Sequence, residues 1–196
     1  MTNSNMDEPL ALFDEWYGAA QDRETLEPTA VTLATADPHG RPSARMVLLK
    51  HFDEHGFVFY TNLESRKGRE LRENPFAALL FHWKSLQRQV RIEGAVKAVS
   101  DAEADAYFNS RHRSSRIGAW ASRQSLPMTG RRDLEMEIAR YTAKFGIGAI
   151  PRPPYWSGFR VVPDSFEFWR EGKFRLHERI VYTRMDNGWA TKRLFP

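Results

Sequence analysis

Residues 30–62, AVTLATADPHGRPSARMVLLKHFDEHGFVFYTN, decide the fold, because strand-like segments in this stretch alternate with turn-forming sequences. The turn sequences are DPHG at 37–40 and DEHG at 53–56, which supply the Asp and Gly residues favoured in tight turns. Short connections of this kind join neighbouring antiparallel strands, so the stretch predicts an antiparallel meander. The three strands are expected at residues 30–36, 43–52 and 57–62.

The rest of the chain adds more strands and a few peripheral helices. Asp186-Asn187-Gly188 is a hairpin signal between the last two strand-like segments. The pattern predicts a mainly β, α+β fold, an antiparallel barrel with flanking helices in one domain over residues 1–196. Further strands are expected at 76–83, 88–99, 156–163, 165–170, 174–184 and 189–196, and helices at 10–20, 65–74, 100–108 and 134–145.

The composition excludes several kinds of chemistry. The chain has no cysteine, so disulfides, thiolate catalysis and sulfur-ligated metals are excluded. Its six histidines are scattered without the close spacing of a zinc site, so no metal is expected. The net charge of +4 attracts anions, but basic and acidic residues are interspersed, so nucleic acid is not required as the partner and a phosphorylated small molecule fits the charge equally well.

The sequence predicts a cytoplasmic protein with no membrane partner. It has no run of eighteen apolar residues, and its start, MTNSNMDEP, lacks the basic and apolar segments of a secretory signal. Residues 1–9 are expected to be disordered. There is also no GxGxxG after the first strand and no P-loop, so side chains must hold any nucleotide-like cofactor.

Basic residues near the ends of the first strands form one candidate anion site. Arg45 and Lys50 flank an apolar segment, and Arg66 and Lys67 follow the third strand. Thr61 and Ser65 add hydroxyl groups to the same region. Such residues can bind a phosphate through charge-assisted hydrogen bonds. The alternative is a solvated surface with ordinary salt bridges.

The segment FEFWREGKFRLHER, residues 166–179, forms a second candidate site. As a strand it places Arg175, His177 and Arg179 on one face and Leu176 on the other. Two guanidinium groups beside an imidazole make a surface that attracts anions. The alternative is an exposed polar strand face.

A third group of candidate residues lies in the sequence between the strands expected at 88–99 and 156–163. Tyr107, Arg111 and Ser115 recur every four residues, so a continuous helix places them on one face, where they can grip a phosphate. A mixed surface helix is the alternative. Other polar residues suit the carbonyls and ring nitrogens of a heterocycle, whereas three tryptophans read as core residues rather than stacking platforms. The polar residues are Gln89, Gln124 and Ser125, and the tryptophans are Trp120, Trp156 and Trp169.

Several of these segments resemble the pyridoxamine 5′-phosphate oxidase family. The resemblance runs from about Leu10 to Pro196, and the blocks agree in order and spacing. It implies a split β-barrel that forms a homodimer with FMN at the subunit interface. The matching blocks are RMVLLK at 45–50, FVFYTNLESRKGREL at 57–71, RQVRIEG at 88–94, IGAW at 117–120, QS at 124–125, and FEFW at 166–169 followed by RLHER at 175–179.

The resemblance assigns roles to individual residues. It implies that Arg175 and His177 are catalytic, with Leu176 between them also contacting the substrate, while four residues grip the substrate phosphate: Lys50, Tyr107, Arg111 and Ser115. The FMN contacts that it implies are Arg45, Met46, Val47, Leu48, Leu49, Lys50, Tyr60, Thr61, Arg66, Lys67, Gln89, Gln124, Ser125, Trp169 and Arg179.

The implied reaction oxidises pyridoxamine or pyridoxine 5′-phosphate to pyridoxal 5′-phosphate, with O2 as electron acceptor and hydrogen peroxide as product. Three alternatives remain: a flavin oxidase of another substrate, as in the phenazine-biosynthesis relatives; a protein that stores flavin or pyridoxal phosphate; and a basic nucleic-acid-binding barrel. The chain also departs from the family pattern. It lacks an Arg-x-x-Tyr segment before the first helix, and it reads RHRSSR at 111–116 where the family commonly has Arg-Pro-Arg-Asp-Ser-Gln.

Overall fold

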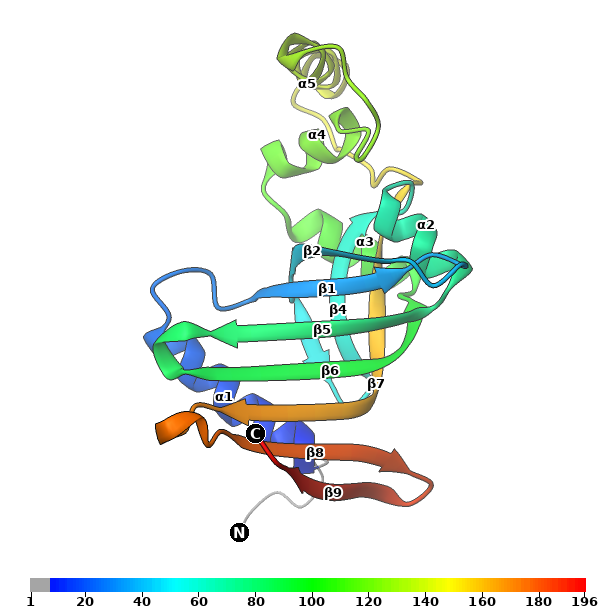
Figure 1. Cartoon of the computed structure of the whole chain (residues 1–196). Coiled ribbons are helices and arrows are strands. Elements are labelled where there is room, and N and C mark those ends of the chain that lie inside the picture. The colour runs from blue at the N-terminus through cyan, green and yellow to red at the C-terminus, as the bar shows by residue number, and fades with distance from the viewer. Residues whose placement is uncertain (1–7) are drawn as a thin grey trace.

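A computed structural model describes residues 8–196 and shows one curled, nine-stranded antiparallel sheet with helices around it (Figure 1). The strand order along the main path is β2-β1-β5-β6-β7-β4-β3, and β8 and β9 extend the sheet from β7. The predicted mainly β class and the barrel with flanking helices are therefore confirmed. The strands are β1 Ala30–Ala36, β2 Pro42–Leu48, β3 His51–Asp53, β4 Gly56–Asn62, β5 Phe76–Trp83, β6 Arg88–Ala98, β7 Trp156–Arg170, β8 Glu178–Met185 and β9 Gly188–Leu194.

Five α-helices and two 3-10 turns are found in the described part of the chain. The predicted helix at 10–20 is longer than expected, and it begins at Glu8. The expectation of disorder over residues 1–9 is therefore wrong for Glu8 and Pro9, and residues 1–7 lie outside the described residues. The helices are α1 Glu8–Arg23, α2 Arg66–Glu73, α3 Asp101–Ser110, α4 Arg113–Ala121 and α5 Arg131–Phe145, and the 3-10 turns are η1 Lys84–Leu86 and η2 Lys173–Arg175.

The expected three-stranded meander is wrong in one respect. β1 and β2 form the predicted antiparallel pair, but β4 pairs with β3 and β7 and not with β2. The chain leaves one edge of the sheet after Leu48 and joins the other edge at His51. Lys50 lies at this crossing, where its backbone N–H donates to the carbonyl oxygen of Val58. The curl of the sheet brings the two edges together there, which makes the barrel split.

The core lies between the concave face of the sheet and α1. Phe13 of α1 is fully buried, and its ring makes edge-on contacts with Phe52, Phe57 and Phe81. Edge-to-face aromatic pairs add about 0.5–1.5 kcal/mol each beyond the area they bury. These contacts fix α1 against one end of the barrel, which leaves the other end for a separate helical lobe.

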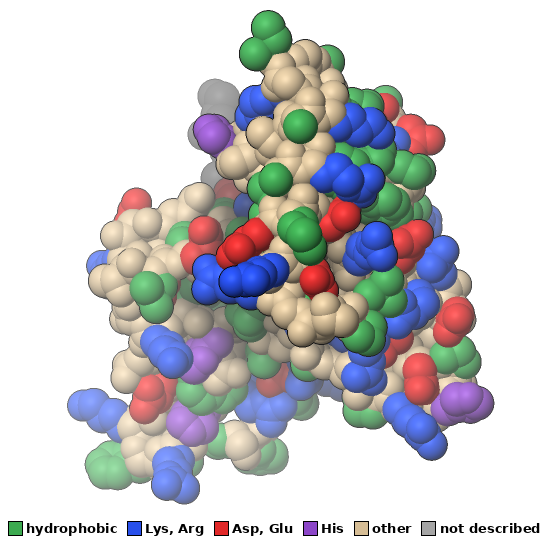
Figure 2. Space-filling model, turned by 90° about the horizontal axis from the view of Figure 1, so that it is seen from above, with side chains coloured by type: hydrophobic (Ala, Val, Ile, Leu, Met, Phe, Trp, Pro, Cys, Tyr) green, Lys and Arg blue, Asp and Glu red, His purple; other side chains and the backbone are tan. Residues whose placement is uncertain are grey.

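The helical lobe consists of α4 and α5, which project from the end of the sheet near α2 and α3 (Figure 1). Trp120 of α4 packs against Tyr141 and Phe145 of α5, with ring centroids 5.5 and 5.6 Å apart. Figure 2 looks down on this end and shows basic and acidic side chains interspersed. No described helix has both the length and the apolar character needed to cross a membrane.

Two strand boundaries near the C-terminus differ from expectation. Segments 156–163 and 165–170 are parts of one long strand, β7, and the predicted strand at 174–184 begins only at Glu178. The Asp-Asn-Gly hairpin is confirmed, because Met185 pairs with Gly188 across a two-residue turn. The residues before Glu178 form a tight loop, which is described with the site.

Candidate active site

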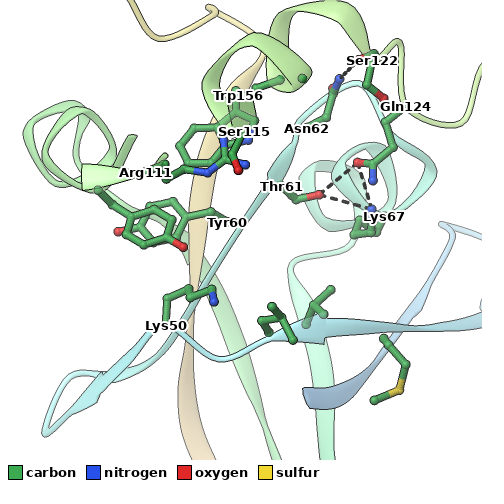
Figure 3. A pocket seen from close by; sticks show the side chains of 16 residues that line it. Lys50, Tyr60, Thr61, Asn62, Lys67, Arg111, Ser115, Ser122, Gln124 and Trp156 are labelled. Atoms are coloured by element: carbon green, nitrogen blue, oxygen red, sulfur yellow. Dashed lines mark hydrogen bonds between the residues drawn. The ribbon is translucent and has the colours of Figure 1, made fainter. Parts of the chain in front are cut away.

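A pocket of about 470 Å³ lies between the helical lobe and the open end of the sheet (Figure 3). Its walls come from β2, β4, α2, α3, α4 and the start of β7. It brings together predicted site residues that are far apart in the sequence. Those that line it are Met46, Val47, Leu48, Lys50, Tyr60, Thr61, Lys67, Tyr107, Arg111, Ser115 and Gln124, together with Asn62, Gly118, Ala119, Ser122 and Trp156.

One side of the pocket is the N-terminus of α2. Ser65 caps this helix by accepting a hydrogen bond from the Gly68 N–H, as the sequence predicted for its start. Lys67 is 7% exposed, and its Nζ donates to Thr61 Oγ1 at 3.2 Å, Ser65 Oγ at 3.2 Å and Gln124 Oε1 at 3.3 Å. A helix N-terminus beside a buried ammonium group is well suited to bind an anion.

The pKa of Lys67 is lowered to about 8, first by burial and then by the nearby positive charge of Arg45, while Glu70 opposes the shift. Because desolvation penalises the charged form of a lysine, an anion that replaces the lost solvation stabilises the ammonium group. Lys67 is therefore more easily neutralised than an exposed lysine, and this links the charge of the pocket to pH.

The opposite side of the pocket is a stack of aromatic rings. Tyr60 stacks on Tyr107 at 4.0 Å and on Trp156 at 5.4 Å between ring centroids. The guanidinium of Arg111 lies over the Trp156 ring at 4.9 Å. Trp156 is thus both a buried residue and part of the pocket wall, which the sequence interpretation did not anticipate.

Arg111 carries an unsatisfied donor. Its Nη1 is buried and has no hydrogen-bond partner among the described residues, and burial lowers its pKa. A buried charged donor without a partner costs several kcal/mol, so its presence is a strong sign that an anion binds there. Arg111 points toward the same space as Ser115 and Tyr60 (Figure 3).

The predicted continuous helix through Tyr107, Arg111 and Ser115 is wrong. α3 ends at Ser110, Arg111 is extended with φ −72° and ψ 149°, and α4 starts after His112. The Nδ1 of His112 accepts a hydrogen bond from the Ser114 N–H and caps the new helix. The break turns the chain, and the three side chains still line one pocket because two helix ends, rather than one helix face, present them.

The remaining predicted residues lie elsewhere. Arg45 and Arg66 do not line the pocket, and both bind Glu70; Leu49 is buried in the core; and Ser125 accepts a weak hydrogen bond from the Arg66 N–H at 3.4 Å. The sequence interpretation missed Glu70 and Asn62. The spacing of Arg66 and Glu70, four residues apart on a helix, was the available signal for Glu70.

A second group of predicted residues forms a row across three strands. Gln89 of β6 pairs in register with Trp169 of β7, and Trp169 pairs with Arg179 of β8. Arg179 Nε donates to the buried carboxylate of Glu167 at 2.7 Å. Trp169 lies near the opposite end of β7 from Trp156, and thirteen residues of strand span roughly 40 Å along its path. Within one chain, this row is therefore separate from the pocket.

The loop between β7 and β8 presents Arg175 and His177. The expected strand alternation is wrong here, because Lys173–Arg175 form a 3-10 turn and both Phe174 and Arg175 have positive φ, at 59° and 63°. Two consecutive left-handed residues other than glycine store strain, which is typical of functional loops. The loop thus holds the Arg175 side chain in solvent beside the row on β6, β7 and β8.

The orientation of His177 is set by two contacts. Its ring lies 4.6 Å from the Trp169 ring, and its Nδ1 accepts a hydrogen bond from the Gly172 N–H at 3.3 Å. An imidazole that accepts at Nδ1 carries its proton on Nε2 in the neutral form. His177 therefore offers an Nε2–H donor to a ligand.

Gly172→Ala should lower turnover about a hundredfold while leaving the fold intact, because Arg175 and His177 are predicted to be catalytic and a displacement of about 1 Å of such groups has an effect of this size. A Cβ at this position would lie 1.8 Å from the carbonyl oxygen of Leu176 and would force the loop open. Steady-state kinetics beside thermal unfolding would measure both effects. Gly130→Ala is the matched control, because nothing lies within 4 Å of a Cβ there. Equal turnover in the two variants would contradict a role for the loop.

Comparisons with known proteins agree over nearly the whole chain. The family model described as pyridoxamine 5′-phosphate oxidase matches residues 19–145, and that of the pyridoxine 5′-phosphate oxidase C-terminal dimerisation region matches residues 156–196. A pyridoxine/pyridoxamine 5′-phosphate oxidase from Rhodospirillum rubrum is 61% identical over 194 residues, which cover 96% of each chain.

Solved structures show the same fold. PhzG from Burkholderia lata, in complex with tetrahydrophenazine-1-carboxylic acid, is 34% identical with a TM-score of 0.92, and the match covers 99% of this chain and 95% of PhzG. An FMN-binding protein from Nostoc punctiforme, related to pyridoxamine 5′-phosphate oxidase, has a TM-score of 0.77 at 17% identity over 98% of this chain and 99% of that one. At that identity the likeness supports the fold alone.

The fold and the pocket together define a split-barrel enzyme with a cationic cavity walled by aromatic rings. The matched family models and the close relative make the assignment specific. The chain belongs to the pyridoxamine 5′-phosphate oxidase family and is an oxidoreductase.

Proposed function

We propose that the protein oxidises pyridoxamine and pyridoxine 5′-phosphate to pyridoxal 5′-phosphate, with FMN as cofactor, O2 as electron acceptor and hydrogen peroxide as product. The observation that carries this proposal is the buried Arg111 Nη1 without a partner, in a pocket that also holds Lys50 and Ser115. A site built to hold a buried charge needs an anion to complete it. A substrate phosphate meets this need.

The pocket also fits FMN. The donors near the N-terminus of α2 suit its phosphate: Lys67 Nζ, the Arg66 backbone N–H and the Arg66 guanidinium. The exposed side chains of Met46 and Leu48 on β2 offer an apolar surface for the flavin ring. When bound, FMN supplies two-electron redox chemistry, and the protein contributes binding, orientation and electrostatics.

Two phosphate-binding regions can therefore be distinguished. Lys67 and α2 form one, and Arg111, Ser115 and Lys50 form the other, around Tyr60 and away from Lys67 (Figure 3). Lys67 is buried in the first region and the Nη1 atom of Arg111 is buried in the second, and hydrogen bonds to charged groups contribute about 1.5–3 kcal/mol each. The arrangement supports simultaneous binding of a phosphorylated cofactor and a phosphorylated substrate.

Arg175 and His177 would act on the substrate ring. The Nε2–H of His177 would donate a hydrogen bond to the 4′ substituent, and the Arg175 guanidinium would stabilise negative charge on the ring oxygen. Because Nδ1 already accepts from Gly172, we assign His177 to positioning the substituent rather than to removing a proton as a base.

The site needs two copies of the chain, acting as a homodimer with FMN at the interface. The pocket and the row bearing Gln89, Trp169 and Arg179 lie at opposite ends of β7, so one chain cannot place both against one ligand. In a twofold dimer, the loop of one copy can close the pocket of the other, and the same contact occurs twice. The match of residues 156–196 to a dimerisation region supports this arrangement.

Absorbance and product assays test the proposal. A purified protein that is yellow and that forms pyridoxal 5′-phosphate and peroxide in equal amounts from pyridoxamine 5′-phosphate would support it. A yellow protein inert to this substrate and to pyridoxine 5′-phosphate would favour oxidation of another ring compound, because PhzG shares the fold. A colourless protein that cannot be loaded with FMN would refute it.

A further inference from the structure

Glu70 on α2 is an acidic residue in the middle of a cationic region. Among residues 8–196 the buried acidic side chains are Glu70 and Glu167, and each pairs with two arginines. Glu70 is 5% exposed and does not line the pocket. A buried carboxylate behind an anion site calls for an explanation, because its own charge repels an anion.

The two oxygens of Glu70 have different partners. Oε2 accepts hydrogen bonds from Thr35 Oγ1 at 2.5 Å, Ser43 Oγ at 2.7 Å and Arg45 Nη2 at 3.1 Å. Oε1 accepts only from Arg66 Nε, at 2.8 Å, among the described residues. One oxygen therefore anchors the carboxylate to β1 and β2, and the other is left to hold Arg66.

The bond through Nε determines what Arg66 can still do. In the described part of the chain, no hydrogen bond engages its Nη1 or Nη2, and its side chain is 59% exposed. A guanidinium fixed at Nε keeps its outer edge free, and that edge matches two phosphate oxygens. The backbone N–H of the same residue lies at the first turn of α2, beside Ser125.

The carboxylate is also charged at neutral pH. Burial alone would raise the pKa of Glu70, but the hydrogen bonds from Thr35, Ser43, Arg66 and Arg45 together lower it to about 2. Its charge in turn opposes the loss of the proton from Lys67, whose pKa is about 8. Glu70 thus supports two cations at once, one by geometry and one by charge.

We propose that Glu70 is a positioning residue that selects the phosphorylated flavin: it fixes the Arg66 guanidinium at the N-terminus of α2, with Nη1 and Nη2 free for the phosphate, and keeps Lys67 charged beside it. This inference rests on the proposed function, because it concerns the FMN that the pocket is proposed to hold. It goes beyond that function by naming the residue that sets the preference for FMN over riboflavin.

Glu70→Gln is the sharpest test. The amide oxygen can keep the contacts of Oε2, whereas the amide nitrogen meets Arg66 Nε donor to donor. We expect FMN to bind about tenfold more weakly, the loss of one charge-assisted contact, while riboflavin affinity is unchanged. Flavin fluorescence titration of the apoprotein measures both. Glu103→Gln, which removes a carboxylate paired with Arg160 outside the pocket, is the control and should change neither affinity.

A pH series separates a charge effect from general loosening of the fold. FMN affinity of the wild type should fall as pH rises through about 8, because Lys67 loses its proton, and riboflavin affinity should not. In Glu70→Gln the fall should begin at lower pH, because the carboxylate no longer raises the pKa of Lys67. If the pH at which FMN affinity falls were the same in Glu70→Gln and the wild type, the proposal that Glu70 keeps Lys67 charged would be wrong.

Arg66→Lys provides a test that does not depend on the folding of a core variant, because Arg66 is largely exposed. Lysine keeps the charge, but its single ammonium group lacks the planar fork with which arginine can hold Glu70 at Nε and present two further donors to a phosphate. We expect a loss of FMN-over-riboflavin preference as large as in Glu70→Gln. Full preference in both variants, in a protein whose wild type binds FMN, would overturn this inference alone, whereas a wild type that does not bind FMN would overturn the proposed function as well.

Discussion

Co-expression of the Arg111→Ala and Arg175→Ala variants should restore about half of the wild-type turnover in the purified heterodimer, although each homodimer is expected to lose nearly all of it. Arg111 belongs to the pocket and Arg175 to the loop after β7, which lie at opposite ends of that strand. In the heterodimer, one site combines both defects and the other combines an intact pocket with an intact loop. The turnover of the heterodimer, as a fraction of the wild-type turnover, therefore gives the fraction of sites that are intact.

Each variant carries a different affinity tag, and two successive purification steps, one for each tag, retain only the mixed dimers. Homodimers of each variant, carried through the same steps, show the background. A heterodimer as inactive as the homodimers would show that the pocket and the loop act within one chain, and the proposed shared site would be wrong. Mixing Arg111→Ala with a second pocket variant, Lys50→Ala, should give no recovery, because the defects then fall on the same half of the site.

Arg111→Ala alone should lower kcat/KM for pyridoxamine 5′-phosphate roughly 30- to 150-fold, equivalent to about 2–3 kcal/mol for a charge-assisted contact to phosphate. The reason is the buried Nη1, which has no partner in the described part of the chain and is proposed to bind the substrate phosphate. Any turnover of unphosphorylated pyridoxamine should change little, because this substrate has no phosphate for Arg111 to bind. The ratio of the kcat/KM values for the phosphorylated and unphosphorylated substrates therefore measures the contribution of the phosphate contact.

The matched control is Arg113→Ala, two residues along the chain. Arg113 donates to the carbonyl oxygen of Gly148 at 2.8 Å and also to Gly146, so it ties α4 to the end of α5 and does not line the pocket. Its removal should lower the thermal stability of the lobe without altering the substrate ratio. If both variants lost the phosphate preference equally, the effect would come from the lobe and not from Arg111.

Local patterns in the sequence predicted most of the secondary structure. The helices predicted at 65–74 and 100–108 begin next to Ser65 and Ser100, and the side chain of each serine caps its helix by accepting from the third backbone N–H. β1 has the predicted bounds, residues 30–36, because this strand-like segment is followed directly by the turn sequence DPHG. These features depend on neighbours within a few residues, which a single sequence displays.

Features set by distant contacts were not predicted from local pattern. The transfer of the chain from β2 to β3 across the sheet depends on how far the whole sheet curls, and no signal at Leu49 and Lys50 reports it. The loop at Phe174 and Arg175 reads as a strand because its left-handed residues are not glycines. Glu70 was missed because its importance comes from Thr35 and Ser43, which are remote in sequence.

The placement of the candidate residues was predicted only in part. The resemblance named one set of FMN contacts, which the structure divides between two places: most of them line the pocket, whereas Gln89, Trp169 and Arg179 form the row across β6, β7 and β8. Linear order cannot tell whether two such groups meet within a chain or between chains. The roles of these residues remain predictions until the variants are measured.

The position of the two groups at opposite ends of β7 has a genetic consequence. If each site is shared, a defective chain that lacks one group leaves one working centre in every mixed dimer, so it behaves as a recessive allele. A chain that lacks both groups inactivates both sites of any dimer that it forms with a wild-type chain. Two mutations that are each recessive should therefore be dominant when they are combined on one chain.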